Sequence, residues 1–144
     1  ADLILITGVG TYPKIYDYKN IAAALENGGF LFIDIGILKE IGNLDPGAVI
    51  LKEVSGNLGS NVEIKNVSLD HPVFDTPNKF SALPSGFASI NDQLEEAFDA
   101  AGLFDNGKLV ALSVRKSYSM MWGTEQQKPA LDFGINILNY ASKN

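Results

Sequence analysis

The 144-residue sequence predicts an α/β fold, a three-layer sandwich with helices on both faces of a mostly parallel sheet. Residues 2–7 and 30–35 form runs that are apolar on both faces, which is typical of strands in the middle of a covered parallel sheet. A segment with helical periodicity lies between these runs and ends at Gly28 and Gly29, so the three segments form a βαβ unit. Such a unit places the carboxyl ends of both strands at one edge of the sheet, where α/β proteins bind ligands.

The first half of the chain is predicted to supply two helices. Asp17 can cap a helix over residues 18–27, because its side chain can accept hydrogen bonds from the free N–H groups of the first turn. A helix over residues 45–57 is expected because Asp45 precedes Pro46, and proline is favoured in the first helical position. The side chains expected to face the core are Ile21, Ala22 and Leu25 in the first helix, and Val49, Ile50 and Val54 in the second.

The second half is predicted to add two strands and two helices. Residues 62–67 alternate between apolar and polar and predict an exposed strand, whereas residues 70–84 contain three prolines and should be irregular. Residues 89–101 carry apolar side chains at helical spacing and predict a helix that Gly102 ends. The remaining expected elements are a turn at residues 105–107, a strand over residues 108–114, a polar surface loop over residues 117–127 and a helix from Pro129, on which Leu131, Ile135 and Leu138 share a face.

Composition excludes several classes of function. The net charge is -6 and the pI about 4.6, which argues against nucleic acid or an anionic membrane surface as a partner, since both attract basic patches. The chain has no cysteine, which excludes disulfides, thiolate metal sites and cysteine nucleophiles. No stretch approaches the roughly 18 apolar residues of a membrane helix, so we expect no direct membrane insertion.

The length fits a single α/β domain over residues 1–144. The sequence lacks an initiator methionine and begins almost directly in a strand, so we expect a processed product or a piece cut from a longer polypeptide. A signal removed in this way would be invisible in the sequence. Cytoplasmic and periplasmic or secreted locations therefore both stay open.

Candidate binding residues lie where the predicted strands end. Aromatic residues in loops at this edge could stack on a sugar or a nucleobase, or anchor a partner protein. Asp34 ends a buried strand, where carboxylates are often functional but also cap helices or bind loop amides. The candidate ligand-binding residues are Gly8, Gly10, Thr11, Tyr12, Asp34, Gly36, His71, Tyr118 and Trp122.

The glycines of the first loop match a phosphate site poorly. Gly8 and Gly10 follow a strand and precede a helix, as the glycines of a phosphate-binding loop do. The third position after Gly10 is Pro13 rather than glycine, however, and no Gly-Lys-Ser/Thr motif follows. A tight turn is the simpler interpretation, and we expect no cofactor.

His71 is the only histidine, which limits catalysis. A Ser-His-Asp arrangement would need a nucleophile such as Ser113 or Ser117, and neither lies in a Gly-x-Ser-x-Gly elbow. A metal site could combine His71 with Asp34 and Asp70, because one imidazole with carboxylates suits a hard or borderline ion. A histidine that pins an irregular loop by a hydrogen bond to the backbone is the simpler interpretation.

The order of several motifs resembles a known bacterial family. These motifs are Ile4-Leu5-Ile6-Thr7-Gly8-Val9-Gly10, Gly28-Gly29-Phe30-Leu31-Phe32-Ile33-Asp34, Asp70-His71-Pro72-Val73-Phe74 and Phe133-Gly134-Ile135-Asn136. Together they are similar to the bacterial domain of unknown function 4159 family, which is related in fold to class I glutamine amidotransferases and to the trehalose-utilisation (ThuA-like) proteins. The resemblance implies a flavodoxin-like or class I glutamine amidotransferase-like fold.

The chain departs from the pattern of this family at positions that bear on chemistry. Val9 stands where the family loop usually has a histidine, and Ile35 where the family often has a second acidic residue. Family members also carry an upstream strand and helix that this sequence does not contain. True amidotransferases need a cysteine nucleophile, so the absence of cysteine excludes that reaction.

A non-catalytic binding or interaction domain is therefore the leading hypothesis, with a carbohydrate-like small molecule or a protein as its ligand. One alternative is a metal-assisted hydrolase that uses Asp34, Asp70 and His71. Another is a structural subunit of an assembly, because an open sheet edge could be covered by a second chain to form a homo-oligomer.

Overall fold

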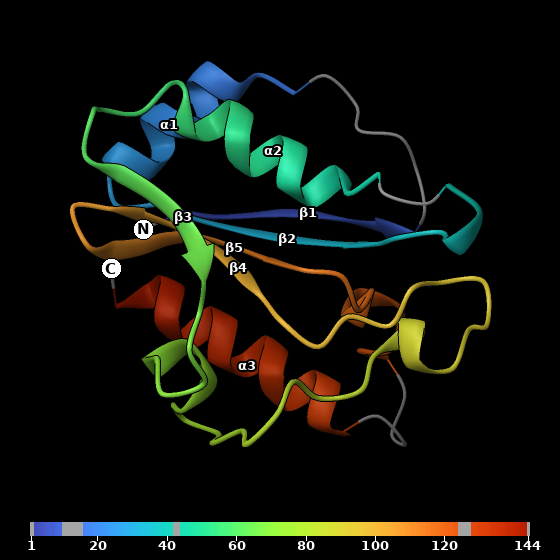
Figure 1. The fold of residues 1–144 in the computed structure, drawn as a ribbon. Helices are drawn as coiled ribbons and strands as arrows, with labels where there is room; N and C mark the ends of the chain where they lie inside the picture. The colour runs from blue at the N-terminus through green and yellow to red at the C-terminus, as the bar shows by residue number, and fades with distance from the viewer. Residues whose placement is uncertain (1, 10–15, 42–43, 124–127, 144) are drawn as a thin grey trace.

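The computed structural model describes residues 2–9, 16–41, 44–123 and 128–143, and it has an α/β fold (Figure 1). A five-stranded sheet in the order β1-β2-β5-β4-β3 lies between two helical layers. The strands are β1 (Leu3–Val9), β2 (Phe30–Gly36), β3 (Val62–Asn66), β4 (Ala101–Asp105) and β5 (Lys108–Val114). The α-helices of the described residues are α1 (Tyr18–Glu26), α2 (Pro46–Ser55) and α3 (Lys128–Ser142).

The βαβ unit is confirmed. β1 and β2 are parallel neighbours, with Leu5 opposite Phe32. Asp17 caps α1, because its Oδ1 accepts the backbone N–H of Asn20 at 3.1 Å. Asp45 caps α2 in the same way by accepting the N–H of Ala48 at 3.2 Å, so both helices begin where predicted.

The sheet is mixed, so the prediction of a mostly parallel sheet is wrong. β2 is parallel to β1 and to β5, but β4 is antiparallel to both β5 and β3. A tight turn joins β4 to β5, and its residues Asn106 and Gly107 have φ values of 51° and 81°. Two left-handed residues suit a tight hairpin, and a two-residue hairpin can only join antiparallel strands.

The predicted helix over residues 89–101 is also wrong. Residues 91–100 are mostly irregular, Phe98 is 83% exposed, and the chain from Ala101 continues as β4. Gly102 lies inside this strand and does not end a helix. A Cβ at Gly102 would lie 2.5 Å from Val67 Cγ2, so a glycine is needed here for the side chain of Val67 to pack against β4.

Each face of the sheet has its own core. α1 and α2 cover one face, and the core there includes Leu25, Ile33 and Ile50. α3 covers the other face, where the core includes Phe32 and Phe133. β2 is buried over its whole length because it contributes to both cores.

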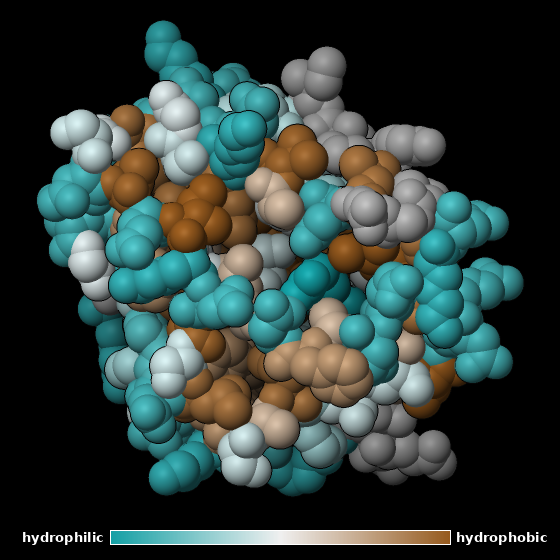
Figure 2. Space-filling view, in the orientation of Figure 1, coloured by the Kyte–Doolittle hydropathy of each residue, from teal (hydrophilic) through white to brown (hydrophobic). Residues whose placement is uncertain are grey.

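The two edges of the sheet differ in chemistry. The β3 edge faces the viewer in Figures 1 and 2, and hydrophilic side chains surround smaller hydrophobic patches on that face. On β3 itself Glu63 and Lys65 are exposed and form an ion pair at 3.5 Å. Charged residues of this kind protect an edge strand from pairing with another chain. β1, at the opposite edge, has no charged residue, and no described strand pairs with its outer side.

Two predictions about burial need correction. Val49 is exposed rather than inward, whereas Ile50 and Val54 are buried as predicted. The predicted surface loop over residues 117–127 begins in the core, because Ser117 and Tyr118 are fully buried, whereas Met120 is exposed. Leu131, Ile135 and Leu138 share a face of α3, as predicted, and this face points away from the core, with each residue exposed by 42% or more.

The described helices are too short or too polar to cross a membrane.

Candidate functional site

The predicted site at the carboxyl ends of the parallel strands is organised around Asp34. This residue lies near the end of β2, opposite Thr7 of β1 and Val114 of β5. Its carboxylate is fully buried and accepts backbone N–H groups from the segment that follows β5. The donors are Lys116 at 3.1 Å, Ser117 at 2.7 Å and Tyr118.

Ser117 completes this arrangement, because its hydroxyl binds both β1 and β2. Its hydroxyl donates to the carbonyl of Gly8 at 2.9 Å and accepts the N–H of Gly36 at 3.0 Å. Its backbone has φ of 52°, which is uncommon for a residue with a side chain and shows that the surroundings hold it firmly. A Cβ at Gly36 would lie 2.6 Å from the Ser117 hydroxyl, so a glycine is needed there.

Four predicted site residues therefore come together here, but they are occupied with one another. Asp34 and Tyr118 are fully buried, and Gly36 is buried as well. The phenol of Tyr118 donates to the carbonyl of Pro84 at 2.7 Å, and burial raises its pKa, as does the charge of Asp34. We call Asp34, Ser117 and the groups they bind the Asp34 clasp, because its polar groups hold loops together and none is free to bind a ligand.

Burial raises the pKa of Asp34 to about 7, and the backbone N–H donors limit this rise. The folded state therefore binds a proton more tightly than the unfolded state, in which the pKa is near 3.8. The stability that this proton contributes is complete below about pH 4 and is lost as the pH rises through about 7.

We expect the free energy of unfolding to fall on this account by about 3 kcal/mol between pH 4 and pH 7. Burial lowers the pKa of His71, so His71 has the opposite effect and stabilises the fold as the pH rises. Urea denaturation at several pH values checks this, with His71→Gln as the control that should steepen the decline. A flat profile in both proteins would contradict it.

His71 lies at the other end of the sheet from Asp34. Its ring contacts the rings of Tyr140 and Phe104, with centroids 5.3 Å and 6.2 Å apart, and Tyr140 packs against Phe30 at the start of β2. Its Nδ1 accepts the N–H of Val73 at 3.2 Å, which is the loop-pinning role predicted as the simpler interpretation.

The proposed metal ligands Asp34, Asp70 and His71 do not converge. Asp70 is exposed beside His71, whereas Asp34 is enclosed at the opposite end of the strands. Among the described residues no group of three or more histidine, aspartate and glutamate side chains could hold a metal ion. The remaining predicted residues Gly10, Thr11 and Tyr12 lie outside the described residues.

Trp122, another predicted site residue, lies in a different site. Its indole stacks near Phe32, with ring centroids 6.5 Å apart, and its Nε1 donates to the carbonyl of Ala130 at 3.0 Å. The ring also covers Gly134 in the middle of α3, where a Cβ would lie 3.2 Å from the indole. Trp122 is half-buried, and its exposed part forms the floor of a groove.

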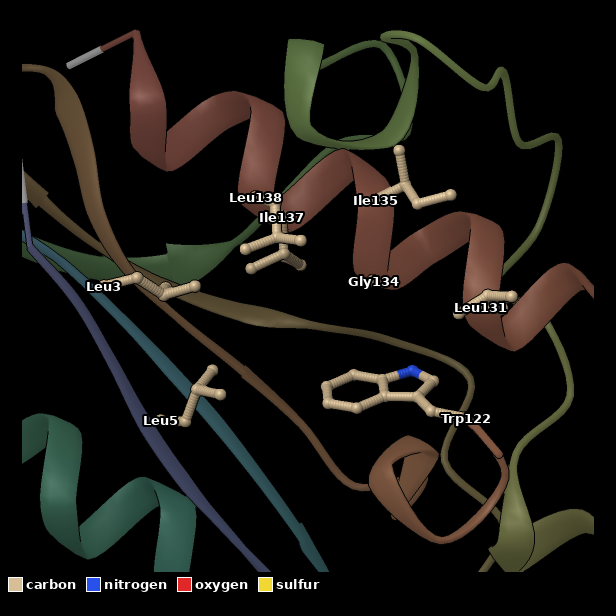
Figure 3. A pocket seen from close by; sticks show the side chains of 8 residues that line it. All are labelled: Leu3, Leu5, Trp122, Leu131, Gly134, Ile135, Ile137 and Leu138. Atoms are coloured by element: carbon tan, nitrogen blue, oxygen red, sulfur yellow. The ribbon is translucent and has the colours of Figure 1, made fainter. Parts of the chain in front are cut away.

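This groove runs between β1 and α3, and we call it the β1–α3 groove (Figure 3). It has a volume of about 200 Å³, and every side chain that lines it is apolar. Leu3 and Leu5 project from β1 toward the helix, and Ile137 and Leu138 point toward them from α3. The lining residues are Leu3, Leu5, Trp122, Leu131, Gly134, Ile135, Ile137 and Leu138.

The β1–α3 groove was not predicted from the sequence, although α3 carries a signal for it. Phe133 and Ile137 face the core, while Leu131, Ile135 and Leu138 form a second apolar stripe on the outside. A helix that is apolar on both sides is usually covered on both sides. The second stripe therefore marks a surface that is suited to contact another molecule.

A polar hollow of about 300 Å³ lies beyond the carboxyl end of β2 and is lined by Lys39, Glu40 and Gln93. These side chains are exposed, and their polar and charged groups could contact a polar small molecule.

Comparison with protein families gives one finding. The model of a family described as Domain of unknown function (DUF4159) matches residues 6–142. No curated protein matches the chain.

Proposed function

We propose, for a chain that belongs to the DUF4159 family of domains of unknown function, that it is a non-catalytic protein-interaction domain that binds through the β1–α3 groove. The family match carries no activity with it, so the proposal depends on the chemistry of the surface.

The observation that carries the proposal is an uncharged apolar groove beside an unprotected edge strand. Leu5 is 49% exposed and Leu138 is 59% exposed, although both belong to regular elements next to the core. Contiguous apolar surface of this kind marks interaction sites on soluble proteins. The charged β3 edge differs in this respect from β1, which has no charged residue and whose outer side pairs with no described strand.

The groove favours a protein over a carbohydrate-like ligand. A sugar carries many hydroxyl groups, and burying them against leucine and isoleucine side chains would leave their hydrogen bonds unmade. The polar hollow beside Lys39 suits a sugar better, but its lining side chains are exposed, so a sugar bound there would stay largely in water.

The positions of Asp34 and His71 do not favour the alternative function, a metal-assisted hydrolase. Asp34 is enclosed, and His71 lies at the far end of the sheet. A shared ancestry with ThuA-like and class I amidotransferase-like domains stays a proposal. Its support is the set of three adjacent parallel strands β1, β2 and β5 with helices on both faces.

Leu138→Glu tests the groove directly. We expect this variant to bind the dye 8-anilinonaphthalene-1-sulfonate, which has an apolar aromatic part and an anionic sulfonate, several-fold more weakly than the unmodified chain, because a carboxylate would enter the apolar lining. Ile90→Glu is the matched control, since Ile90 is 63% exposed and does not line the groove. Dye fluorescence and urea denaturation measure both effects, and neither variant should lose more than about 0.5 kcal/mol of stability.

Equal dye binding by both variants would contradict the proposal that the groove is the main apolar surface. A reproducible turnover by the purified chain that is lost in His71→Gln would contradict the non-catalytic assignment.

A further inference from the structure

We infer that His71 makes residues 71–75 sensitive to pH: the neutral imidazole holds this segment against α3, and a protonated imidazole releases it while the chain stays attached at Asn78. His71 does not line the β1–α3 groove, so the inference is independent of the proposed function. It gives the single histidine of the chain a regulatory role rather than a catalytic or metal-binding one.

The imidazole must be neutral to hold the segment. Its Nδ1 accepts the backbone N–H of Val73 at 3.2 Å, so this nitrogen carries no proton. A charged imidazole has a proton on both ring nitrogens and cannot accept a hydrogen bond. Protonation would therefore set two donors, the Nδ1–H and the Val73 N–H, against each other and remove this bond.

The sheet side of the surroundings does not stabilise a positive charge on His71. No ion pair joins the imidazole to Asp70 or to any other carboxylate of the described residues. Phe104 of β4 contacts the ring, but the Nζ of Lys65 on β3 already lies 4.7 Å from the Phe104 centroid and would repel a second cation. Glu63 is paired with Lys65 at 3.5 Å and is not available to the imidazole.

The helix side offers His71 no counter-charge either. The ring contacts that of Tyr140 on α3, whose phenol is uncharged and donates to the carbonyl of Leu109 at 3.0 Å. Burial lowers the pKa of His71 in this position, whereas in an open segment the imidazole would be in water with its ordinary pKa near 6.5. The open form therefore binds a proton more tightly, and acid shifts the equilibrium toward it.

Val73 is attached on two sides, and a proton can remove only one of these attachments. Its N–H donates to His71, and its carbonyl accepts the side-chain NH₂ of Asn136 on α3 at 3.1 Å. Val73 is fully buried, and its segment packs beside α3 (Figure 1). The amide of Asn136 does not titrate, and its oxygen accepts the N–H of Asn78 at 2.9 Å. Loss of the His71 bond therefore loosens the turn that begins at His71 and leaves Asn78 attached.

Amide hydrogen exchange, measured for each residue by NMR from about pH 7.5 to about pH 4 and corrected for the intrinsic pH dependence of exchange, tests this inference. We expect the protection of the Val73 N–H to fall by about fivefold or more as the ring is protonated. The midpoint of this fall should coincide with that of the imidazole nitrogen shifts and lie below the ordinary pKa of histidine. The N–H of Asn78 should not lose protection.

His71→Asn is the matched variant, because asparagine caps a helical turn through a side-chain oxygen that does not titrate. We expect the protection of the Val73 N–H in this variant to stay within about twofold over the same pH range. His71→Ala has no acceptor, so its Val73 N–H should show the lowered protection at both ends of the range.

Three results would overturn the inference. A fall in Val73 protection that persists in His71→Asn would assign the response to another group, such as Asp70 or Asp75. An imidazole that titrates without any change at Val73, or that stays neutral down to about pH 4, would show that its proton does not control the segment. An equal loss of protection at Val73 and Asn78 would show that the chain unfolds more widely instead of opening at His71.

Discussion

Asp34→Asn is expected to lower the free energy of unfolding by about 1–3 kcal/mol, because the lost acceptor costs more than the neutral amide gains by avoiding the burial of a charge. In the Asp34 clasp one carboxylate oxygen accepts the N–H groups of Lys116 and Ser117, and the other accepts that of Tyr118. An asparagine oxygen could replace one of these acceptors, but its NH₂ group would then face an N–H donor. Two buried donors without an acceptor cost about 1–3 kcal/mol each.

Urea denaturation at pH 8 measures this change under conditions in which Asp34 is ionised. The control is Asp17→Asn, because Asp17 caps α1 at the surface and asparagine is an equally good cap. We expect the control to remain within about 0.5 kcal/mol of the unmodified chain. A mild effect of Asp34→Asn would mean that the Asp34 clasp contributes little to stability and that its buried carboxylate has another role.

The parts of the fold that depend on local signals could be predicted from the sequence. Asp17 and Asp45 mark the starts of α1 and α2 through hydrogen bonds within one turn of chain. β4 could not be found in this way, because the apolar side chains of residues 89–101 have helical spacing and predict a helix that Gly102 ends. Residues 101–105 become a strand only by pairing with β5 and β3. The turn at Asn106 and Gly107 contained the missing information, since a two-residue hairpin requires a strand on each side.

The candidate site could be predicted in position but not in role. The rule that ligands bind at the carboxyl ends of parallel strands brought Gly8, Asp34 and Gly36 together. It could not show that the segment after β5 folds back and occupies their hydrogen-bonding groups, because that contact joins residues more than 80 positions apart. The β1–α3 groove was not predicted, because Gly134 and Asn136 interrupt the apolar pattern of α3, and the pattern therefore does not show which face of the helix is buried.

Asn136 explains how a polar residue can mark the buried face of α3. Its side chain is fully buried and bonds to three backbone groups of the irregular segment beside the helix. The amide NH₂ donates to the carbonyls of Val73 at 3.1 Å and Asn78 at 2.7 Å, and the amide oxygen accepts the N–H of Asn78 at 2.9 Å. These bonds attach α3 to the segment that contains His71, so the position of the helix, and of the groove that it lines, depends on them.

Asn136→Asp is therefore expected to destabilise the chain by about 3–5 kcal/mol at pH 8. The new carboxylate can still accept the N–H of Asn78, but its second oxygen would face two carbonyl oxygens that have lost their donor. Asn139→Asp on the same helix is the matched control, because Asn139 makes one longer bond, to the carbonyl of Thr76 at 3.3 Å, and is only half-buried. Urea denaturation should show a loss of about 1 kcal/mol or less for that control. If the two variants were equally stable, apolar packing around Phe133 would be sufficient to hold α3, and the hydrogen bonds of Asn136 would set only its register against the neighbouring segment.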